Sequence, residues 1–269
     1  MKKSLINYLP ILMVCLIGWQ VSTAQNLVTF APPEPPKPAV PVKVDTVITV
    51  IDAAKDYRRV TVMMNTITVS DGHYIGKKKT GTWYTYQPSG VLLTLTDYEN
   101  DVRSGNYLEF DKNGNLIVME NYHNGKLDGV QKRFTQGKTG RIIKSSYSYK
   151  DGVYNGECNE YTQEGLLQSS INYTNGKKDG VARWYFSSGK TAMEQHYQND
   201  ALNGKQTIFD QKGTVISEGN FVNNVKTGPW TEYHPNGKVK SSGAYTNDQK
   251  TGEWKYFKED GSLEKTEKF

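Results

Sequence analysis

The sequence predicts an all-β fold: an elongated single sheet of about eight antiparallel β-hairpin repeats of 24 residues, preceded by a short N-terminal cap. A glycine recurs every 24 residues, with one step of 27, at Gly81, Gly105, Gly129, Gly156, Gly180, Gly204, Gly228 and Gly252. An aromatic residue follows each of these glycines after five positions, and another aromatic closes each unit. A fixed period of this kind indicates a repeat architecture.

Each unit has the composition of a β-hairpin. Residues rich in Thr, Tyr, Trp and Phe lead into turns such as Pro235-Asn236-Gly237, where glycine can adopt a positive φ and Asn tolerates one. A turn centred on the Asn-Gly pair predicts that the aromatic before it faces an aliphatic residue after it. The predicted pairs are Tyr86 with Leu92, Phe110 with Leu116, Tyr161 with Leu167, Tyr233 with Val239, and Phe257 with Leu263.

The connections between units are expected to be looser turns of about six residues, as at 124–129, 175–180 and 223–228. None is long enough for a helical crossover, so all neighbouring strands should be antiparallel, and sixteen strands would make a ribbon roughly 75 Å long. In the unit with three extra residues, the segment 136–140 is expected to form a lengthened turn.

The aromatic residues predict a ladder along one face of the sheet, serving as a core or as a binding surface. Tryptophan stands two residues after the glycine in three units, whereas the middle units have Gln131, Cys158, Ala182 and Gln206 there. The candidate ladder consists of Trp83, Tyr86, Tyr107, Phe110, Phe134, Tyr161, Tyr185, Phe209, Trp230, Tyr233, Trp254 and Phe257.

The pattern Asn-Gly-Lys-x-x-Gly-x-Trp-x-x-Tyr-x-x-x-Gly-x-hydrophobic, seen with small departures at 223–239 and 247–263, resembles the variant MORN repeat. Arrays of this variant occur in exported proteins of Bacteroidetes-type bacteria and in the family of YwqK-type antitoxins. The resemblance covers about 190 residues. It implies a hairpin array with an interaction role, of which an antitoxin or immunity function is one particular case.

The N-terminus is typical of a secretory signal peptide, because basic residues precede an apolar run at 9–19 and small residues at 22–24. The run is too short for a membrane span. We therefore expect a signal peptide at 1–24, cleavage before Gln25, and export to the periplasm, the outer-membrane surface or the extracellular space. Cleavage would remove two lysines and reduce the net charge from +5 to +3.

The remaining chain divides into three parts by composition. Six prolines at 32–41 predict a stiff extended spacer over residues 25–43. Two β-like runs at 44–75 read as a degenerate unit that caps the array, since Tyr74 lies one period before Tyr98. The eight repeats occupy 76–269.

The sequence offers little that predicts chemistry, so we expect neither an enzyme nor a cofactor. The four histidines fall at different phases of the repeat without metal-ligand spacing. Lys-Thr-Gly recurs in turns without the partner motifs of a β-lactamase. Two acidic pairs, Glu157 with Glu160 and Glu259 with Asp260, lack an apolar pocket to raise a pKa. The single cysteine of the mature chain, Cys158, is expected to be a buried structural thiol.

Lysines near the inter-unit turns, such as Lys126, Lys226 and Lys250, suit anionic lipid headgroups or nucleic acid. Acidic residues interrupt them and export argues against nucleic acid, so a solvated edge is the simpler interpretation. Two function classes remain: a non-catalytic exported scaffold for an unknown protein partner, and an envelope module that binds glycan or lipid with aromatic rings. Burial of Tyr86, Tyr161, Tyr185 and Tyr233 beneath another layer would favour the first.

Overall fold

The computed structural model describes residues 42–138 and 140–269, which form one open antiparallel sheet of 20 strands without a helix. The expected signal peptide and the spacer up to residue 41 lie outside the described residues. The strands are β1 (Val44–Asp52), β2 (Tyr57–Met64), β3 (Ile67–Ile75), β4 (Lys78–Tyr86), β5 (Leu92–Glu99), β6 (Val102–Phe110), β7 (Leu116–His123), β8 (Lys126–Leu127), β9 (Gly129–Gly137), β10 (Gly140–Lys150), β11 (Val153–Tyr161), β12 (Leu167–Thr174), β13 (Lys177–Tyr185), β14 (Thr191–Gln198), β15 (Ala201–Phe209), β16 (Val215–Val222), β17 (Val225–Tyr233), β18 (Val239–Thr246), β19 (Gln249–Phe257) and β20 (Leu263–Lys268).

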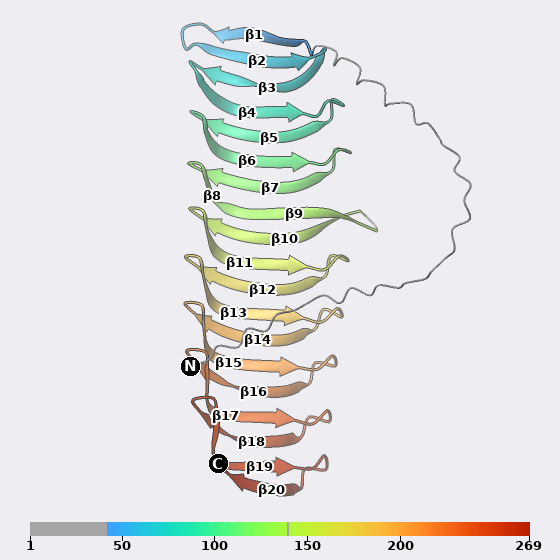
Figure 1. Cartoon of the computed structure of the whole chain (residues 1–269), viewed down its shortest axis with the longest axis vertical. Coiled ribbons are helices and arrows are strands. Elements are labelled where there is room, and N and C mark those ends of the chain that lie inside the picture. The colour runs from blue at the N-terminus through green and yellow to red at the C-terminus, as the bar shows by residue number, and fades with distance from the viewer. Residues whose placement is uncertain (1–41, 139) are drawn as a thin grey trace, which may run out of the picture. The chain divides into compact units, whose positions relative to one another are not determined.

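With the exception of β8, each strand pairs with the next one along the chain, so the sheet grows in sequence order (Figure 1). The short β8 and the longer β9 both pair with β7 and are two parts of one strand. The eight repeats therefore provide the sixteen predicted strands, with β1–β3 added before them. The predicted fold class is confirmed, as are the five predicted cross-strand pairs from Tyr86–Leu92 to Phe257–Leu263.

The two kinds of turn are the reverse of those predicted. The connection between units is a tight two-residue turn: Asn223 and Asn224 both have positive φ, 49° and 69°, between the paired Val222 and Val225. The turn within a unit is the longer one. Its Asn236 keeps a negative φ, and only Gly237 is left-handed, with its amide donating to the His234 carbonyl at 2.8 Å.

The 27-residue unit also differs from the prediction. Gly137 and Gly140 are directly paired, so the additional residues lengthen β9 and β10 instead of the turn. This hairpin consequently extends beyond its neighbours on one side of the sheet (Figure 1).

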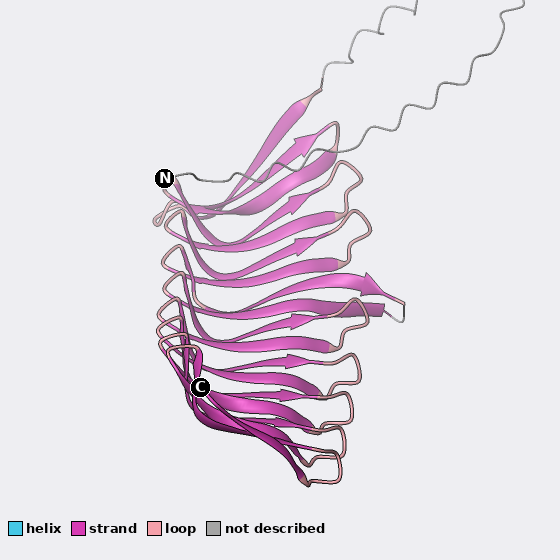
Figure 2. Ribbon diagram, turned by 60° about the horizontal axis from the view of Figure 1, so that its bottom comes forward, coloured by secondary structure: helices cyan, strands magenta, loops and turns pink. Residues whose placement is uncertain are grey.

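The recurring first glycine marks a bend in every unit. All eight of these glycines have positive φ, from 63° at Gly81 to 121° at Gly204. The pairing register jumps at the same place: Ile171 faces Ala182, but Tyr173 already faces Lys178. Such a bulge bends its strand, and because it recurs in phase the whole sheet curves (Figure 2). Glycine is needed because other residues avoid this conformation.

A continuous line of side chains runs across the strands next to this bend, and we call it the central row. Its members face one another directly across neighbouring strands, and we call the face that carries them the inner face. They are Trp83, Thr96, Tyr107 and Glu120, then Gln131, Tyr147, Cys158, Ile171, Ala182, Gln195, Gln206, Gly219, Trp230 and Gly243, and finally Trp254 opposite Glu267. The buried members are Trp83, Thr96, Gln131, Cys158, Ala182, Gln195, Trp230 and Trp254.

Each tryptophan of the central row packs over a glycine on the preceding strand: Trp83 over Gly72, Trp230 over Gly219 and Trp254 over Gly243. Trp230 lies between Gly219 and Gly243, whereas Ala182 lies between the larger Ile171 and Gln195. Strands are only about 4.8 Å apart, so neighbours in the row compete for one volume. In units without tryptophan, a larger side chain on the adjacent strand fills the volume that the indole would occupy, as Ile171 does beside Ala182. A Cβ added to Gly243 would lie 2.3 Å from the Trp254 ring.

Replacing Gly243 by Ala should lower the free energy of unfolding by about 2 kcal/mol, because the methyl group overlaps a buried indole with no room to move. Urea unfolding measures this change. In a Trp254→Ala background the same substitution should cost much less, because the clash is gone. Equal costs in the two backgrounds would show that the indole does not pack against Gly243.

The first three strands contain an ion pair between a largely exposed guanidinium, that of Arg59, and a buried carboxylate, that of Asp71. Arg59 donates from Nε and Nη2 to the two carboxylate oxygens of Asp71 at 2.8 and 2.7 Å, and Thr61 adds a third hydrogen bond. The Asp71 side chain is 10% exposed. The hydrogen bond from Arg59 is the main cause that lowers the pKa of Asp71 below its ordinary value.

This lowered pKa predicts an acid-sensitive N-terminal region. Ionised Asp71 contributes stability above the ordinary aspartate pKa of about 4, and the contribution is lost as pH falls through the lower pKa of the folded state. The stability gap between the wild type and Asp71→Asn should therefore be large at neutral pH and should shrink below about pH 4. Unfolding curves measured across that range test it. A gap that stays constant with pH would contradict this role of Asp71.

Candidate functional site

Aromatic rings pack edge to face along the inner face. Trp254 meets Tyr245 with centroids 5.2 Å apart, and Trp230 meets Tyr245 and Phe221 at 5.6 and 5.5 Å. Tyr74 of β3 packs against Trp83 at 5.0 Å in the same way. The aromatic that closes one unit therefore packs against the tryptophan of the next.

A cation covers these rings in five units. It stands two residues before the first glycine, and its charged group lies over the faces of nearby rings. Lys250 Nζ is 4.3 Å from the Trp254 centroid, and Lys226 Nζ is 4.5 Å from that of Trp230. The other members are Lys79, Arg103 and Lys178. Leu127, Tyr154 and Leu202 stand at this position in the remaining units. Lys226 and Lys250 thus pack on the core and do not form a solvated stripe.

The predicted one-face ladder is wrong. Trp83 and Tyr86 are three residues apart in one strand, and an odd separation places them on opposite faces. Tryptophans 83, 230 and 254 are between 2% and 6% exposed on the inner face, with Tyr107 half-buried beside them. The other eight members, Tyr86, Phe110, Phe134, Tyr161, Tyr185, Phe209, Tyr233 and Phe257, are half-buried near the turns on the opposite, outer face.

No second layer covers the outer face within residues 42–138 and 140–269. The half-burial of Tyr86, Tyr161, Tyr185 and Tyr233 therefore comes from neighbours in the same sheet. Tyr233, for example, donates to Glu218 at 2.7 Å. These rings are neither the core of a two-layer structure nor freely exposed platforms.

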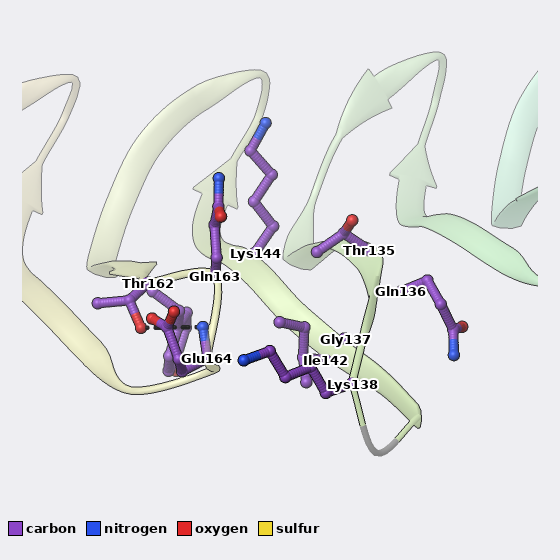
Figure 3. Close-up of a pocket in the computed structure, with 10 residues that line it drawn as sticks. Thr135, Gln136, Gly137, Lys138, Ile142, Lys144, Thr162, Gln163 and Glu164 are labelled. Atoms are coloured by element: carbon purple, nitrogen blue, oxygen red, sulfur yellow. Dashed lines mark hydrogen bonds between the residues drawn. The ribbon is translucent and has the colours of Figure 1, made fainter.

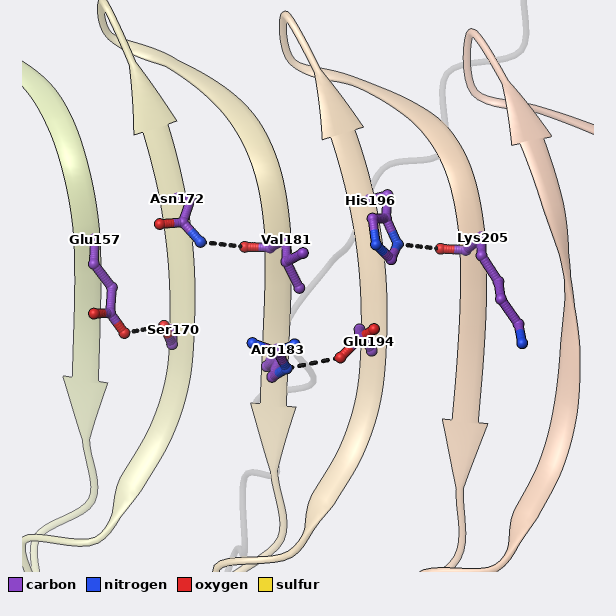
Figure 4. A network of polar contacts seen from close by, with 8 residues as sticks. All are labelled: Glu157, Ser170, Asn172, Val181, Arg183, Glu194, His196 and Lys205. Carbon is purple, nitrogen blue, oxygen red and sulfur yellow. Dashed lines mark hydrogen bonds and ion pairs between the residues drawn. The ribbon is translucent and has the colours of Figure 1, made fainter.

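The outer face is polar in the later units (Figure 4). Arg183 donates to Glu194 at 2.7 Å, and Ser170 donates to Glu157 at 2.6 Å. Lys205 and Glu218 form a further pair at 2.7 Å on the next strands. These side chains satisfy one another across the strands, as expected for a solvated sheet face.

The same face is apolar in the first two units. Tyr84 faces Leu95, Leu95 faces Leu108, and Leu108 faces Met119 in directly opposed pairs on β4–β7. Leu93 and Ile117 share the face by alternation, and Leu93 is 37% exposed. We call Tyr84, Leu93, Leu95, Leu108, Ile117 and Met119 the outer apolar patch. In the sequence, Leu93 and Leu95 alternate with the residues of the inner face. Later units have polar residues at the corresponding positions.

The longest hairpin also creates a hollow of about 750 Å³ beside the turn after β11 (Figure 3). Its charged lining residues are Lys138, Lys144 and Glu164, accompanied by the ring of Tyr161. The turn is held internally, since the Glu164 amide donates to Thr162 Oγ1 at 3.2 Å. The hollow is a consequence of the three-residue insertion.

Reactive groups are kept apart. Glu157 and Glu160 point to opposite faces, as their odd separation requires, and burial raises the pKa of Glu160. Burial also raises the pKa of the Cys158 thiol, so it stays protonated and unreactive. Among residues 42–138 and 140–269 no group of three metal-ligating side chains occurs.

Burial and a hydrogen bond to Glu109 raise the pKa of Tyr107 to about 12. This phenol therefore remains neutral over the physiological range and acts as a hydrogen-bond donor within the inner face. The part of the chain that the structure describes has no helix long and apolar enough to cross a membrane.

Comparison with known proteins supports the repeat assignment. The family model described as "MORN repeat variant" matches residues 79–100, 103–124, 178–199, 202–223 and 226–247. No curated protein matches the chain. A solved structure described as "Crystal Structure of TcdB2-TccC3-Cdc42" aligns at 10% identity over 78% of this chain and 13% of that chain, with a TM-score of 0.22. This chain thus corresponds to a small part of that protein's length.

The five matched segments begin at or near the residue that covers the rings and end at the tight turn between units, so each corresponds to one hairpin. The unmatched middle contains the lengthened hairpin and the unit with Cys158. The array therefore carries five segments that match the MORN repeat variant, which indicates a repeat scaffold for protein or membrane interaction.

Proposed function

We propose that the protein is an exported, non-catalytic repeat scaffold that binds a protein partner through its outer face. The observation that carries this proposal is the outer apolar patch. Four of its residues, Tyr84, Leu95, Leu108 and Met119, form an unbroken line across β4–β7. A continuous apolar area bordered by polar residues is characteristic of protein-binding surfaces.

The inner face supports the same assignment by exclusion. The tryptophans of its central row, Trp83, Trp230 and Trp254, are at most 6% exposed, and cations such as Lys79, 4.5 Å above Trp83, occupy their remaining ring faces. These rings stabilise the bend and are not available to stack on a ligand. The extended outer face is the surface that an array of this kind offers to a partner.

Envelope glycan or lipid binding is the second candidate. The observation in its favour is the row of half-buried aromatics near the turns, such as Tyr161 and Tyr185, which recur once per unit on the outer face. Successive rings lie on every second strand, so they are about 10 Å apart. A regular spacing of rings suits a repeating polymer, although several members are phenylalanines that cannot donate a hydrogen bond.

Export and an immunity-like role are also parts of the proposal. Export rests on the basic and apolar N-terminus, and N-terminal sequencing of the protein recovered from its native envelope should start at Gln25. The immunity role rests on the resemblance to the YwqK-type antitoxins. An exported immunity protein would act against a toxin outside the cytoplasm, so the partner should itself be an envelope or secreted protein.

Replacing Leu108 by Lys should weaken partner binding by about tenfold or more, because a buried contact becomes a desolvated charge. Thr207→Lys is the matched control, since Thr207 occupies the same repeat position in the polar part of the outer face. The partner is first captured with the tagged mature chain, and its affinity for each variant is then measured by calorimetry.

Thermal unfolding should show that both variants remain folded. Equal affinities of the two variants for the captured protein would refute the patch as the binding surface. Binding to envelope glycan or lipid vesicles that is lost in Tyr161→Ala but kept in Leu108→Lys would favour the second candidate.

A further inference from the structure

The strand β1 is an exposed and apolar sheet edge. Within residues 42–138 and 140–269 it pairs with β2 on one side and with no strand on the other. Val47, Ile48, Val50 and Ile51 are between 51% and 64% exposed. An edge of this kind presents a row of free backbone donors and acceptors that can pair with another strand.

The opposite edge of the sheet has the reverse character. β20 carries Glu264, Lys265, Glu267 and Lys268, with Lys265 and Glu267 paired at 2.7 Å. Charges along an edge strand oppose strand addition. The segment 46–51 of β1 contains no charge at all, so among residues 42–138 and 140–269 the β20 edge carries charges that oppose strand addition and the β1 edge carries none there.

The regular part of β1 is complementary to itself. Its pairing with β2 runs without interruption from Val44 to Val50, and its middle residue is Val47. Two antiparallel copies centred there place Val44 opposite Val50 and Val47 opposite its own counterpart. Thr46 then faces Ile48, and no charged residue faces another of the same sign. Opposed β-branched residues are favourable cross-strand pairs.

We propose that β1 pairs with β1 of a second copy of this chain, which joins two arrays into one continuous antiparallel sheet about a two-fold axis at Val47. Symmetric pairing closes the assembly at two chains. A head-to-tail contact between β1 and β20 would instead continue without limit, and it would place the charges of β20 against apolar residues.

The two-fold axis stands perpendicular to the sheet, because antiparallel strands related by symmetry must keep equal side chains on equal faces. The two outer faces therefore lie on the same side of the dimer. Each outer apolar patch begins at β4, close to the dimer axis, so a bivalent partner could bind both patches with increased avidity. The dimer itself does not depend on the proposed function.

Sedimentation equilibrium of the full exported chain tests this proposal, and we expect a dimer. Val47→Lys and Val47→Glu should each raise the dimer dissociation constant about tenfold or more, because like charges then lie directly opposite each other. An equimolar mixture of the two variants should restore dimerisation, since the lysine of one variant would then face the glutamate of the other across the axis. Circular dichroism checks that each variant keeps the β-sheet signal.

Thr266→Lys on β20 is the control and should leave the dimer unchanged. A monomeric wild type, including one whose β1 is covered by another segment of the same chain, would overturn the proposal. Loss of the dimer in Thr266→Lys would assign the contact to the other edge. Failure of the mixed Val47 variants to associate would overturn the two-fold axis at this residue.

Discussion

The packing of the central row at the bend of the sheet is the interaction on which the other features depend. A sheet without a second layer cannot bury side chains against a partner sheet. Here a bulge at one glycine per unit folds each strand toward the inner face, and the closing aromatic and its cation then cover the row. The period of the sequence is thus the period of a repeated local core.

This arrangement explains why the tryptophans can be absent from the middle of the array. Row neighbours share a fixed volume, so the Trp230 ring requires glycine at Gly219 on the preceding strand, where an added Cβ would lie 2.1 Å from the ring, whereas Ala182 accommodates Ile171. The missing indole volume is supplied by the adjacent strand, and the units remain in phase. Variation along the inner face therefore follows from packing.

The outer face varies in composition along the array. It bears no part of the core, and its composition changes from the apolar line at Leu95 and Leu108 to the ion-paired surface at Arg183 and Glu194. Such a gradient does not follow from the repeat, since the hairpin and its bulge recur in units of both kinds. It is the reason for our proposal that the first units contact a partner.

The repeat period, the antiparallel order and the pairing of residues such as Tyr86 and Leu92 could all be predicted from the sequence, because they depend on spacing alone. The turn types could not be predicted from the sequence. Asn-Gly suits both the turn within a unit and the turn between units, and the bulge at the first glycine shifts the pairing register. The placement of Trp83 and Tyr86 on opposite faces was available from their odd separation. The cations over the rings were unpredictable, since contact between Lys79 and Trp83 depends on the bend.

Hydroxyl-radical footprinting of the intact protein, read out by mass spectrometry, tests the two-faced account most directly. The account predicts slow oxidation of Trp83, Trp230 and Trp254 on the inner face and faster oxidation of Tyr84 and Met119 on the outer face, after correction for intrinsic reactivity. Indoles oxidised as readily as those outer residues would show that the inner face is open to water and would contradict the account.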